Sequence, residues 1–160
     1  MLRKPNDSRP REYMAMHNEI MSLIKRKDIC VLATVSKDRP HCSLMAYVTD
    51  EDCRAIYLVT HRTTKKYNNL LQNPFVSLLI DNRDEFPEAA APGSQALTIF
   101  GLFQKMDNQG EIDEIRLQFI RKHPRLNPFI DHPDAEIVCI KVQSLQLLDG
   151  LTDSFFEEAY

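Results

Sequence analysis

Residues 60–66 read Thr-His-Arg-Thr-Thr-Lys-Lys, and they join a predicted strand to the helix that follows it. Apolar positions then recur at helical spacing until the Asn-Pro pair at 73–74, which ends the pattern. We therefore expect a short amphipathic helix over residues 65–72, with Thr63 or Thr64 as its N-terminal cap. The turn between this strand and this helix carries the most unusual charges of the chain.

Three cations, Arg62, Lys65 and Lys66, crowd the start of the predicted helix. Free N–H groups already make the electrostatic field positive there, so each cation destabilises the helix by roughly a few tenths of a kcal/mol. Amides, threonine hydroxyls and cations that converge on one point suit a phosphate group, which makes the turn a candidate anion site. A solvated basic face is the alternative interpretation of the same residues.

A second predicted helix, over residues 109–122, places its charges in the opposite way. It opens with an Asn108 cap, carries acids in its first turn and ends with basic residues, as the helix dipole favours. The acids are Glu111, Asp113 and Glu114, and the basic residues are Arg121, Lys122 and His123. Because charges are placed conventionally here, the inversion at Lys65 and Lys66 favours an anion site.

The composition argues against several classes of protein. The chain has 160 residues, a formal net charge of −3 and no tryptophan, which disfavours a nucleic-acid surface or a polybasic membrane arm. The N-terminus lacks a signal-peptide core and no stretch approaches the roughly 18 apolar residues of a membrane span, so we expect a cytoplasmic protein. No metal site is expected, because the four cysteines lack ligand spacing and the acids at 50–52 lack a calcium-loop glycine.

Six strands are predicted, over residues 29–35, 41–49, 54–61, 75–80, 95–106 and 135–147. The fourth is continuously apolar and is predicted to be buried on both faces, and Gly101 predicts a bulge or a close backbone approach in the fifth. Tight turns between most of the strands favour a closed antiparallel barrel over a parallel sheet.

The predicted domain organisation is a single domain over residues 1–160. It has an N-terminal helix within residues 1–28, a barrel over 29–147 that carries the helices at 65–72 and 109–122, and a tail over 148–160.

Several motifs occur in a consistent order along residues 29–106. Pro40 opens the second strand, Thr60 ends the third and Gly101 lies in the fifth, while residues 73–79 read Asn-Pro-Phe-Val-Ser-Leu-Leu. Together with Thr-Lys-Lys at 64–66, this order resembles the flavin-binding split-barrel proteins related to pyridoxamine 5′-phosphate oxidase. The oxidases carry Ser-Arg-Lys at that last position.

The resemblance implies a mainly β fold with helices: a six-stranded antiparallel split barrel that forms a homodimer, with FMN at the dimer interface. It also implies a set of cofactor contacts by position. The phosphate would be held by Thr64, Lys65 and Lys66 with Arg62 as a helper, and the ring or ribityl chain would contact Val59 and Thr60. The isoalloxazine edge would meet the backbone of Ser43, Leu44 and Met45, and the partner subunit would contribute Gln95.

The resemblance is incomplete at two places. Ser43 and Val48 stand where the oxidases carry an Arg and a Lys that contact FMN, and residues 155–160 lack their substrate-binding arginine. Pyridoxamine phosphate oxidase activity itself is therefore not expected. A broader FMN-dependent oxidoreductase with an unidentified substrate fits better, with NADH or NADPH as a candidate electron donor.

Other functions stay open at this point. The same barrel would also suit a protein that binds flavin, haem or a deazaflavin for storage or sensing without turnover. A barrel that has lost its ligand and acts through protein contacts is a further alternative. Tyr47, His41 and His61 lie nearest to the proposed site in sequence and are candidate proton donors, but packing or rim positions are the favoured interpretation, so no catalytic residue is assigned.

Overall fold

The computed structural model describes residues 9–88 and 91–159, with side chains from residue 11 onward. Within this part of the chain, the strands are β1 (Ile29–Ser36), β2 (Arg39–Thr49), β3 (Ala55–His61), β4 (Phe75–Asp81), β5 (Gln95–Lys105), β6 (Ala135–Asp149) and β7 (Asp153–Glu158). The helices are α1 (Arg9–Arg26), α2 (Lys65–Gln72), α3 (Gln109–Lys122) and α4 (Asn127–Ile130), with a 3-10 turn at Pro124–Leu126. None of the described helices combines the length and the apolarity that crossing a membrane requires.

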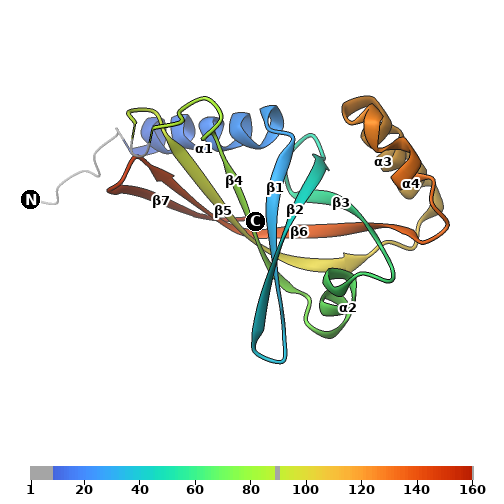
Figure 1. Cartoon of the computed structure of the whole chain (residues 1–160). Helices are drawn as coiled ribbons and strands as arrows, with labels where there is room; N and C mark the ends of the chain where they lie inside the picture. The colour runs from blue at the N-terminus through green and yellow to red at the C-terminus, as the bar shows by residue number, and fades with distance from the viewer. Residues whose placement is uncertain (1–8, 89–90, 160) are drawn as a thin grey trace, which may run out of the picture.

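The strands form one antiparallel sheet that closes on itself (Figure 1). The order is β3-β2-β1-β4-β5-β6-β7, and an additional pairing of β3 with β6 closes a barrel of six strands. The long strand β6 has three neighbours: one edge pairs with β5, and on the other edge residues 135–141 pair with β3 and residues 144–149 pair with β7. The predicted mainly β fold with a closed antiparallel barrel is therefore confirmed.

The C-terminal segment differs from the prediction of a tail over residues 148–160. Most of it forms β7, which pairs with β6 and extends the sheet beyond the barrel. On β7, Phe155 packs against the main core, Phe156 on the opposite face is exposed, and Glu157 Oε1 lies 2.9 Å from His17 Nδ1 of α1. The side chains of β7 alternate between the two faces of the sheet. The sequence did not reveal this alternation, because the serine and acidic residues leave few apolar positions in the segment.

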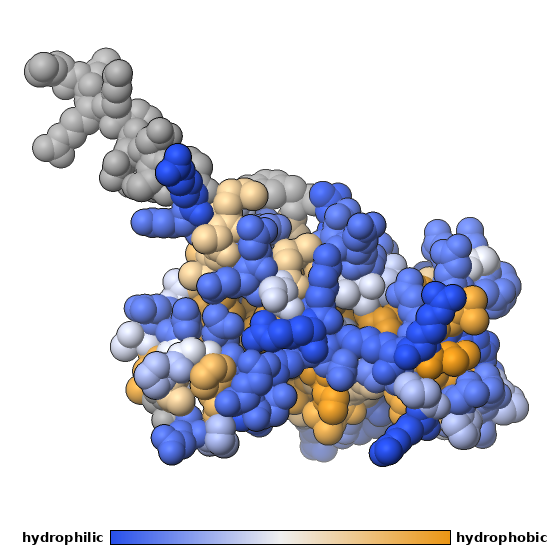
Figure 2. All heavy atoms as spheres, turned by 90° about the horizontal axis from the view of Figure 1, so that it is seen from above, coloured by the Kyte–Doolittle hydropathy of each residue, from blue (hydrophilic) through white to orange (hydrophobic). Residues whose placement is uncertain are grey.

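The barrel interior and α1 share the main hydrophobic core. Ile20, Leu23 and Ile24 of α1 are fully buried in the same cluster as Leu32 and Ile56 of the barrel. Each such side chain contributes about 1.5–3 kcal/mol when it leaves water. Figure 1 shows α1 lying across the upper end of the barrel, and Figure 2, from above, shows mainly hydrophilic side chains on that face with hydrophobic groups between them.

A second, smaller core lies outside the barrel under α3 and α4. It contains Val48 of β2, Val59 of β3, Ile115 and Phe119 of α3, and Ile130 of α4. Since α2 packs mainly on β1 and α3 packs on β2, the two predicted internal helices cover different parts of the barrel.

The bulge predicted at Gly101 is present. The β5–β6 register shifts between Phe100 and Gly101, and the backbone of the two strands comes close there. A Cβ at position 101 would clash with Ile140 Cγ2 and would lie 3.2 Å from Lys141 O. Glycine is required at this position because only hydrogen fits the space.

Candidate cofactor-binding site

α2 begins at the predicted residue, and Thr64 caps it. The Thr64 hydroxyl donates to His61 O at 2.9 Å and accepts a hydrogen bond from the Tyr67 N–H at 3.4 Å. Thr60 Oγ1, at the buried end of β3, lies 2.9 Å from Thr64 Oγ1. Hydroxyl groups therefore join the end of β3 directly to the start of α2.

The first turn of α2 has no acidic residue. The backbone N–H groups of Lys65 and Lys66 lack partners inside the helix, as at every helix start. Neither ammonium group forms an ion pair or a hydrogen bond with the described residues, although Lys66 is half-buried. Two uncompensated cations therefore remain where the helix dipole is least favourable to them.

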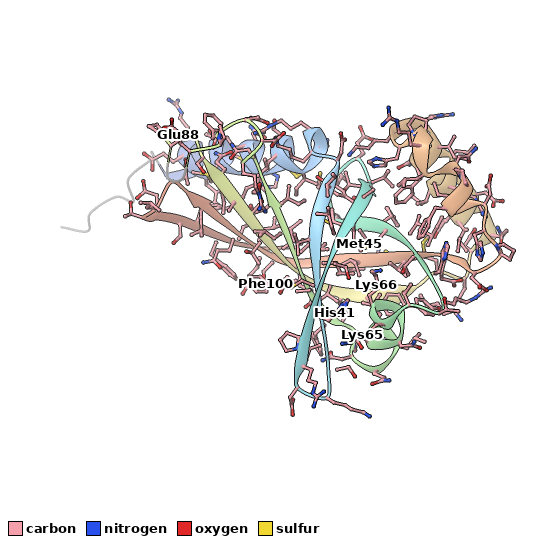
Figure 3. All side chains as sticks on the ribbon, viewed as in Figure 1. His41, Met45, Lys65, Lys66, Glu88 and Phe100 are labelled. Carbon is pink, nitrogen blue, oxygen red and sulfur yellow. The ribbon has the colours of Figure 1, made fainter. Side chains whose placement is uncertain are left out.

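α2 is fixed against the β1–β2 hairpin. Buried Asn69 donates from Nδ2 to Thr34 Oγ1 at 3.0 Å, and the Ser36 hydroxyl donates to Gln72 Oε1 at 2.6 Å. Thr34 pairs with His41 across the hairpin, so the side chain of His41 lies on the face that α2 covers. Figure 3 labels Lys65 and Lys66 on α2, and His41 and Met45 on β2.

A split in the barrel adjoins this helix start. β2 and β3 pair only over residues 47–49 and 56–58, so residues 39–46 of β2 have no strand on that edge. The Tyr47 N–H bonds to Asp28 O on the opposite side, and antiparallel alternation then turns the backbone N–H and C=O of Leu44 toward the split. A row of backbone groups is thus available next to the cations of α2.

Several predicted site residues do not direct their side chains into the split. The side chain of Met45 is buried in the main core, and that of Val59 is buried in the second core beneath α3. Ser43 is half-buried, and its hydroxyl lies 3.4 Å from His41 Nδ1. Of the backbone contacts predicted for residues 43–45, only that of Leu44 faces the split, because the same alternation turns the N–H and C=O groups of Ser43 and Met45 toward β1. The Val59 side chain also faces away from the split.

Arg62, predicted as a phosphate helper, is neutralised by neighbouring acids. Its Nη1 donates to Glu136 Oε2 at 3.2 Å, its Nη2 donates to Pro133 O at 2.8 Å, and Asp134 Oδ1 lies 3.8 Å away. These contacts tie the turn before α2 to the start of β6. Burial raises the pKa of nearby Tyr67, and the Glu136 carboxylate raises it further, while Arg62 acts in the opposite direction.

Gln95 lies in a different region from the other candidates. It begins β5 near α1, where its Nε2 donates to Glu19 Oε2 at 3.3 Å and its N–H donates to Asn82 Oδ1 at 2.7 Å. One chain therefore does not bring Gln95 to the α2 site. Its predicted role requires a second subunit.

The three candidate proton donors differ in availability. The Tyr47 hydroxyl is fully buried, donates to Ile24 O at 2.6 Å, and has a pKa raised by burial. His61 stacks between Phe129 and His132, with ring centroids 3.9 and 4.5 Å away. Only His41 lies on the hairpin face next to α2.

A family model described as pyridoxamine 5′-phosphate oxidase matches residues 16–148, which is most of the chain. The chain belongs to the pyridoxamine 5′-phosphate oxidase family. The predicted resemblance is thereby confirmed, and it covers more of the sequence than the motifs of residues 29–106.

Individual relatives are more distant. A pyridoxamine 5′-phosphate oxidase homologue from Schizosaccharomyces pombe is 29% identical, over 74% of this chain and 77% of that protein. A haem-binding protein from Mycobacterium smegmatis superimposes with a TM-score of 0.77 at 17% identity, over 98% of this chain and 60% of its own. General Stress Protein 26 from Bacillus anthracis superimposes with a TM-score of 0.70 at 19% identity, over 91% of this chain and 100% of its own. This chain thus spans less than two thirds of the mycobacterial protein, and the structural likenesses show the fold.

An exposed apolar face on the outer surface of this chain's barrel was not identified from the sequence. Leu44, Val31 and Leu79 form one cross-strand row on β2, β1 and β4, and Phe75 and Phe100 lie further along the same face. Leu44 is 73% exposed and Phe75 is 64% exposed. β4 was predicted to be buried on both faces, but in the single chain only its inner face is covered. The continuous run of apolar residues in β4 was the available signal.

Proposed function

We propose that this member of the pyridoxamine 5′-phosphate oxidase family is an FMN-binding flavoprotein and an oxidoreductase with a small-molecule redox partner. The observation that carries the proposal is the pair of uncompensated cations, Lys65 and Lys66, at the start of α2 beside the open edge of β2. No residue of the described chain neutralises this pair, and the first turn of α2 also offers free backbone N–H groups.

The residues at this point fit a phosphate monoester. Its charge at neutral pH is close to −2, and two ammonium groups neutralise it. The N–H groups of the first turn add donors that already point outward from the helix. The Thr64 hydroxyl fixes the helix start through its bonds to His61 O and Tyr67 N, so the donors are held in place before a ligand arrives.

The split between β2 and β3 fits the remainder of the cofactor. Leu44 presents backbone N–H and C=O groups there, which suit the hydrogen-bonding edge of a flavin ring. When bound, the isoalloxazine supplies hydride or single-electron transfer, while the protein supplies position and solvent exclusion. Ser43, Leu44, Met45, Val59, Thr60, Thr64, Lys65 and Lys66 are the residues of this chain that we assign to the site, with Arg62 holding the turn. Val59 would take part through its backbone alone, because its side chain lies in the second core.

The exposed apolar face supports a homodimer with the cofactor at the interface. Leu44, Val31 and Leu79 adjoin the split, and monomeric proteins rarely leave a large contiguous apolar patch uncovered. A second copy that covers this face would also bury the outer side of β4, as the sequence predicts. It would bring Gln95, which is remote in one chain, to the partner's site.

We do not expect pyridoxamine phosphate oxidase activity, because Ser43 and Val48 replace the two cationic FMN contacts of the oxidases. NADH and NADPH are the electron donors to test first. We place the protein in the cytoplasm, where both compounds are abundant.

The test is to titrate purified protein with FMN, to follow quenching of flavin fluorescence, and to measure molar mass by light scattering. The proposal predicts saturation at one FMN per chain and a mass of two chains. A protein that is colourless as purified and leaves FMN fluorescence unchanged would overturn it. Anaerobic mixing of the FMN complex with NADH or NADPH then shows whether the bound flavin is reduced.

The second candidate function is haem binding or storage without turnover, and a deazaflavin is a third possible ligand. The specific observation for haem is the fold likeness to the haem-binding protein from Mycobacterium smegmatis. His41, on the hairpin face that α2 covers, would supply an imidazole as an axial ligand. Titration with haemin distinguishes the two, since a Soret band that is lost in His41→Ala, with no response to FMN, favours haem.

A further inference from the structure

A second cavity, separate from the split, lies between α3, α4 and the paired ends of β3 and β6. Its volume is about 240 Å³. The apolar part of its wall comes from Val59, Ile112, Ile130 and Ile137. For scale, an engineered cavity of about 150 Å³ binds benzene, so this one has room for a small organic molecule.

Two side chains of opposite charge line the same cavity. Arg116 comes from α3, and its Nη2 donates to Ile130 O at 2.6 Å while Asp131 Oδ1 lies 4.0 Å away. Glu136 comes from β6, and its Oε2 accepts from Arg62 Nη1 at 3.2 Å. These bonds hold both charged groups in position at the wall of the cavity.

Both groups keep unused hydrogen-bonding capacity. Within the described residues, Nε and Nη1 of Arg116 have no partner, and Oε1 of Glu136 accepts no hydrogen bond. The third polar residue of the wall, Gln109, already donates its amide to Asp113 Oδ1 at 2.8 Å. The free donors and the free acceptor are therefore charged, of opposite sign, and adjacent to an apolar wall.

We propose that this cavity binds a free aliphatic α-amino acid. Arg116 would receive the carboxylate, because a guanidinium matches that group with two parallel N–H donors. Glu136 would receive the ammonium group through its free oxygen. The apolar residues of α3, α4 and the strands would bury a branched side chain of the size of leucine or valine. A zwitterion brings no net charge, which suits a site whose own two charges are opposite.

The binding experiment uses L-leucine as the probe in isothermal titration calorimetry with the full chain. Two analogues separate the recognition elements: L-leucinamide lacks the carboxylate, and N-acetyl-L-leucine lacks the ammonium group. Each lost charge-assisted contact should weaken binding roughly tenfold to a hundredfold. The proposal predicts saturable binding of one L-leucine per chain and this loss with both analogues.

The variants Arg116→Gln and Glu136→Gln should weaken L-leucine binding by a similar factor. Arg121→Gln, on the exposed part of the same helix, is the control that should leave it unchanged. Circular dichroism verifies that each variant is folded. Absence of saturable L-leucine and L-valine binding to the wild-type chain overturns the proposal, as does equal affinity for L-leucinamide and L-leucine. None of these readouts depends on flavin.

Discussion

α2 and α3 are the two helices inserted between the strands of this barrel, and their charges are arranged in opposite ways. α3 has Glu111 in its first turn and Arg121 and Lys122 in its last, which is the order the helix dipole stabilises. α2 has Lys65 and Lys66 in its first turn and no acidic residue there. Both helices have a side-chain N-cap, Asn108 for α3 and Thr64 for α2, so capping does not explain the difference. The charges of α3 match the dipole of their helix, whereas those of α2 oppose it, and in our proposal a bound phosphate group compensates the cations of α2.

The largest effect is expected on FMN affinity when the two cations of α2 are removed. In Lys65→Ala/Lys66→Ala, FMN affinity should fall by roughly 3–6 kcal/mol, because each charge-assisted contact contributes about 1.5–3 kcal/mol. Fluorescence titration measures this change. The control is Lys25→Ala/Arg121→Ala, which removes two exposed cations from the last turn of α1 and of α3 and should leave affinity unchanged. An equal loss in both double variants would mean that overall charge, rather than position, governs binding.

The next largest effect concerns the contribution of α3 to stability. Phe119 is fully buried in the second core, so Phe119→Ala should lower the free energy of unfolding by about 3–5 kcal/mol. Urea denaturation followed by circular dichroism measures it. The FMN affinity of the folded variant should match the wild type. A loss of FMN binding without a loss of stability would place α3, rather than α2, in the cofactor site.

The two N-caps give a smaller and sharper contrast. Thr64→Ala and Asn108→Ala should each cost about 1 kcal/mol of stability, since each removes a similar capping bond. Only Thr64→Ala should also weaken FMN binding. If both variants, or neither, change the FMN dissociation constant, the cap of α2 has no special role.

The smallest effect is on stability in the absence of ligand. Removing both wrong-sign cations in Lys65→Ala/Lys66→Ala should raise the free energy of unfolding by roughly 0.3–1 kcal/mol per site, whereas Glu111→Ala should lower it by a similar amount. Thermal unfolding of the apo-protein at low salt measures both changes. A stability loss in the lysine variant would show that these cations serve the fold.

The sequence was sufficient for those parts of the fold whose signals are local. The bounds of α2 follow from the Asn-Pro pair at 73–74 and the hydroxyls before Lys65, which left Thr63 or Thr64 as the cap until the structure showed that it is Thr64. The bulge at Gly101 follows from one glycine in a strand. The charge inversion at α2 could also be predicted from the sequence, because only the first residue of the helix and the charges of two side chains have to be known.

The remaining features depend on contacts between distant parts of the chain. β7 forms because residues 153–158 pair with the part of β6 that does not pair with β3. The composition of the segment alone does not predict this long-range pairing. The sequence suggested Arg62 as a third cation for binding the phosphate. In the folded chain, Glu136 and Asp134 lie beside it. The cavity beside Arg116 likewise requires α3, α4 and β6 to meet. Gln95 lies beside Glu19 and Asn82, away from α2, and only in our proposal do Gln95 and the apolar face of β4 meet a second subunit.

The most direct test of the α2 assignment compares FMN with riboflavin, which is the same flavin without the phosphate. Dissociation constants are measured for both ligands with the wild-type chain and with Lys65→Ala/Lys66→Ala. The account predicts that the wild type strongly prefers FMN and that the double variant binds both flavins with nearly equal affinity. An undiminished preference for FMN in the double variant would contradict it.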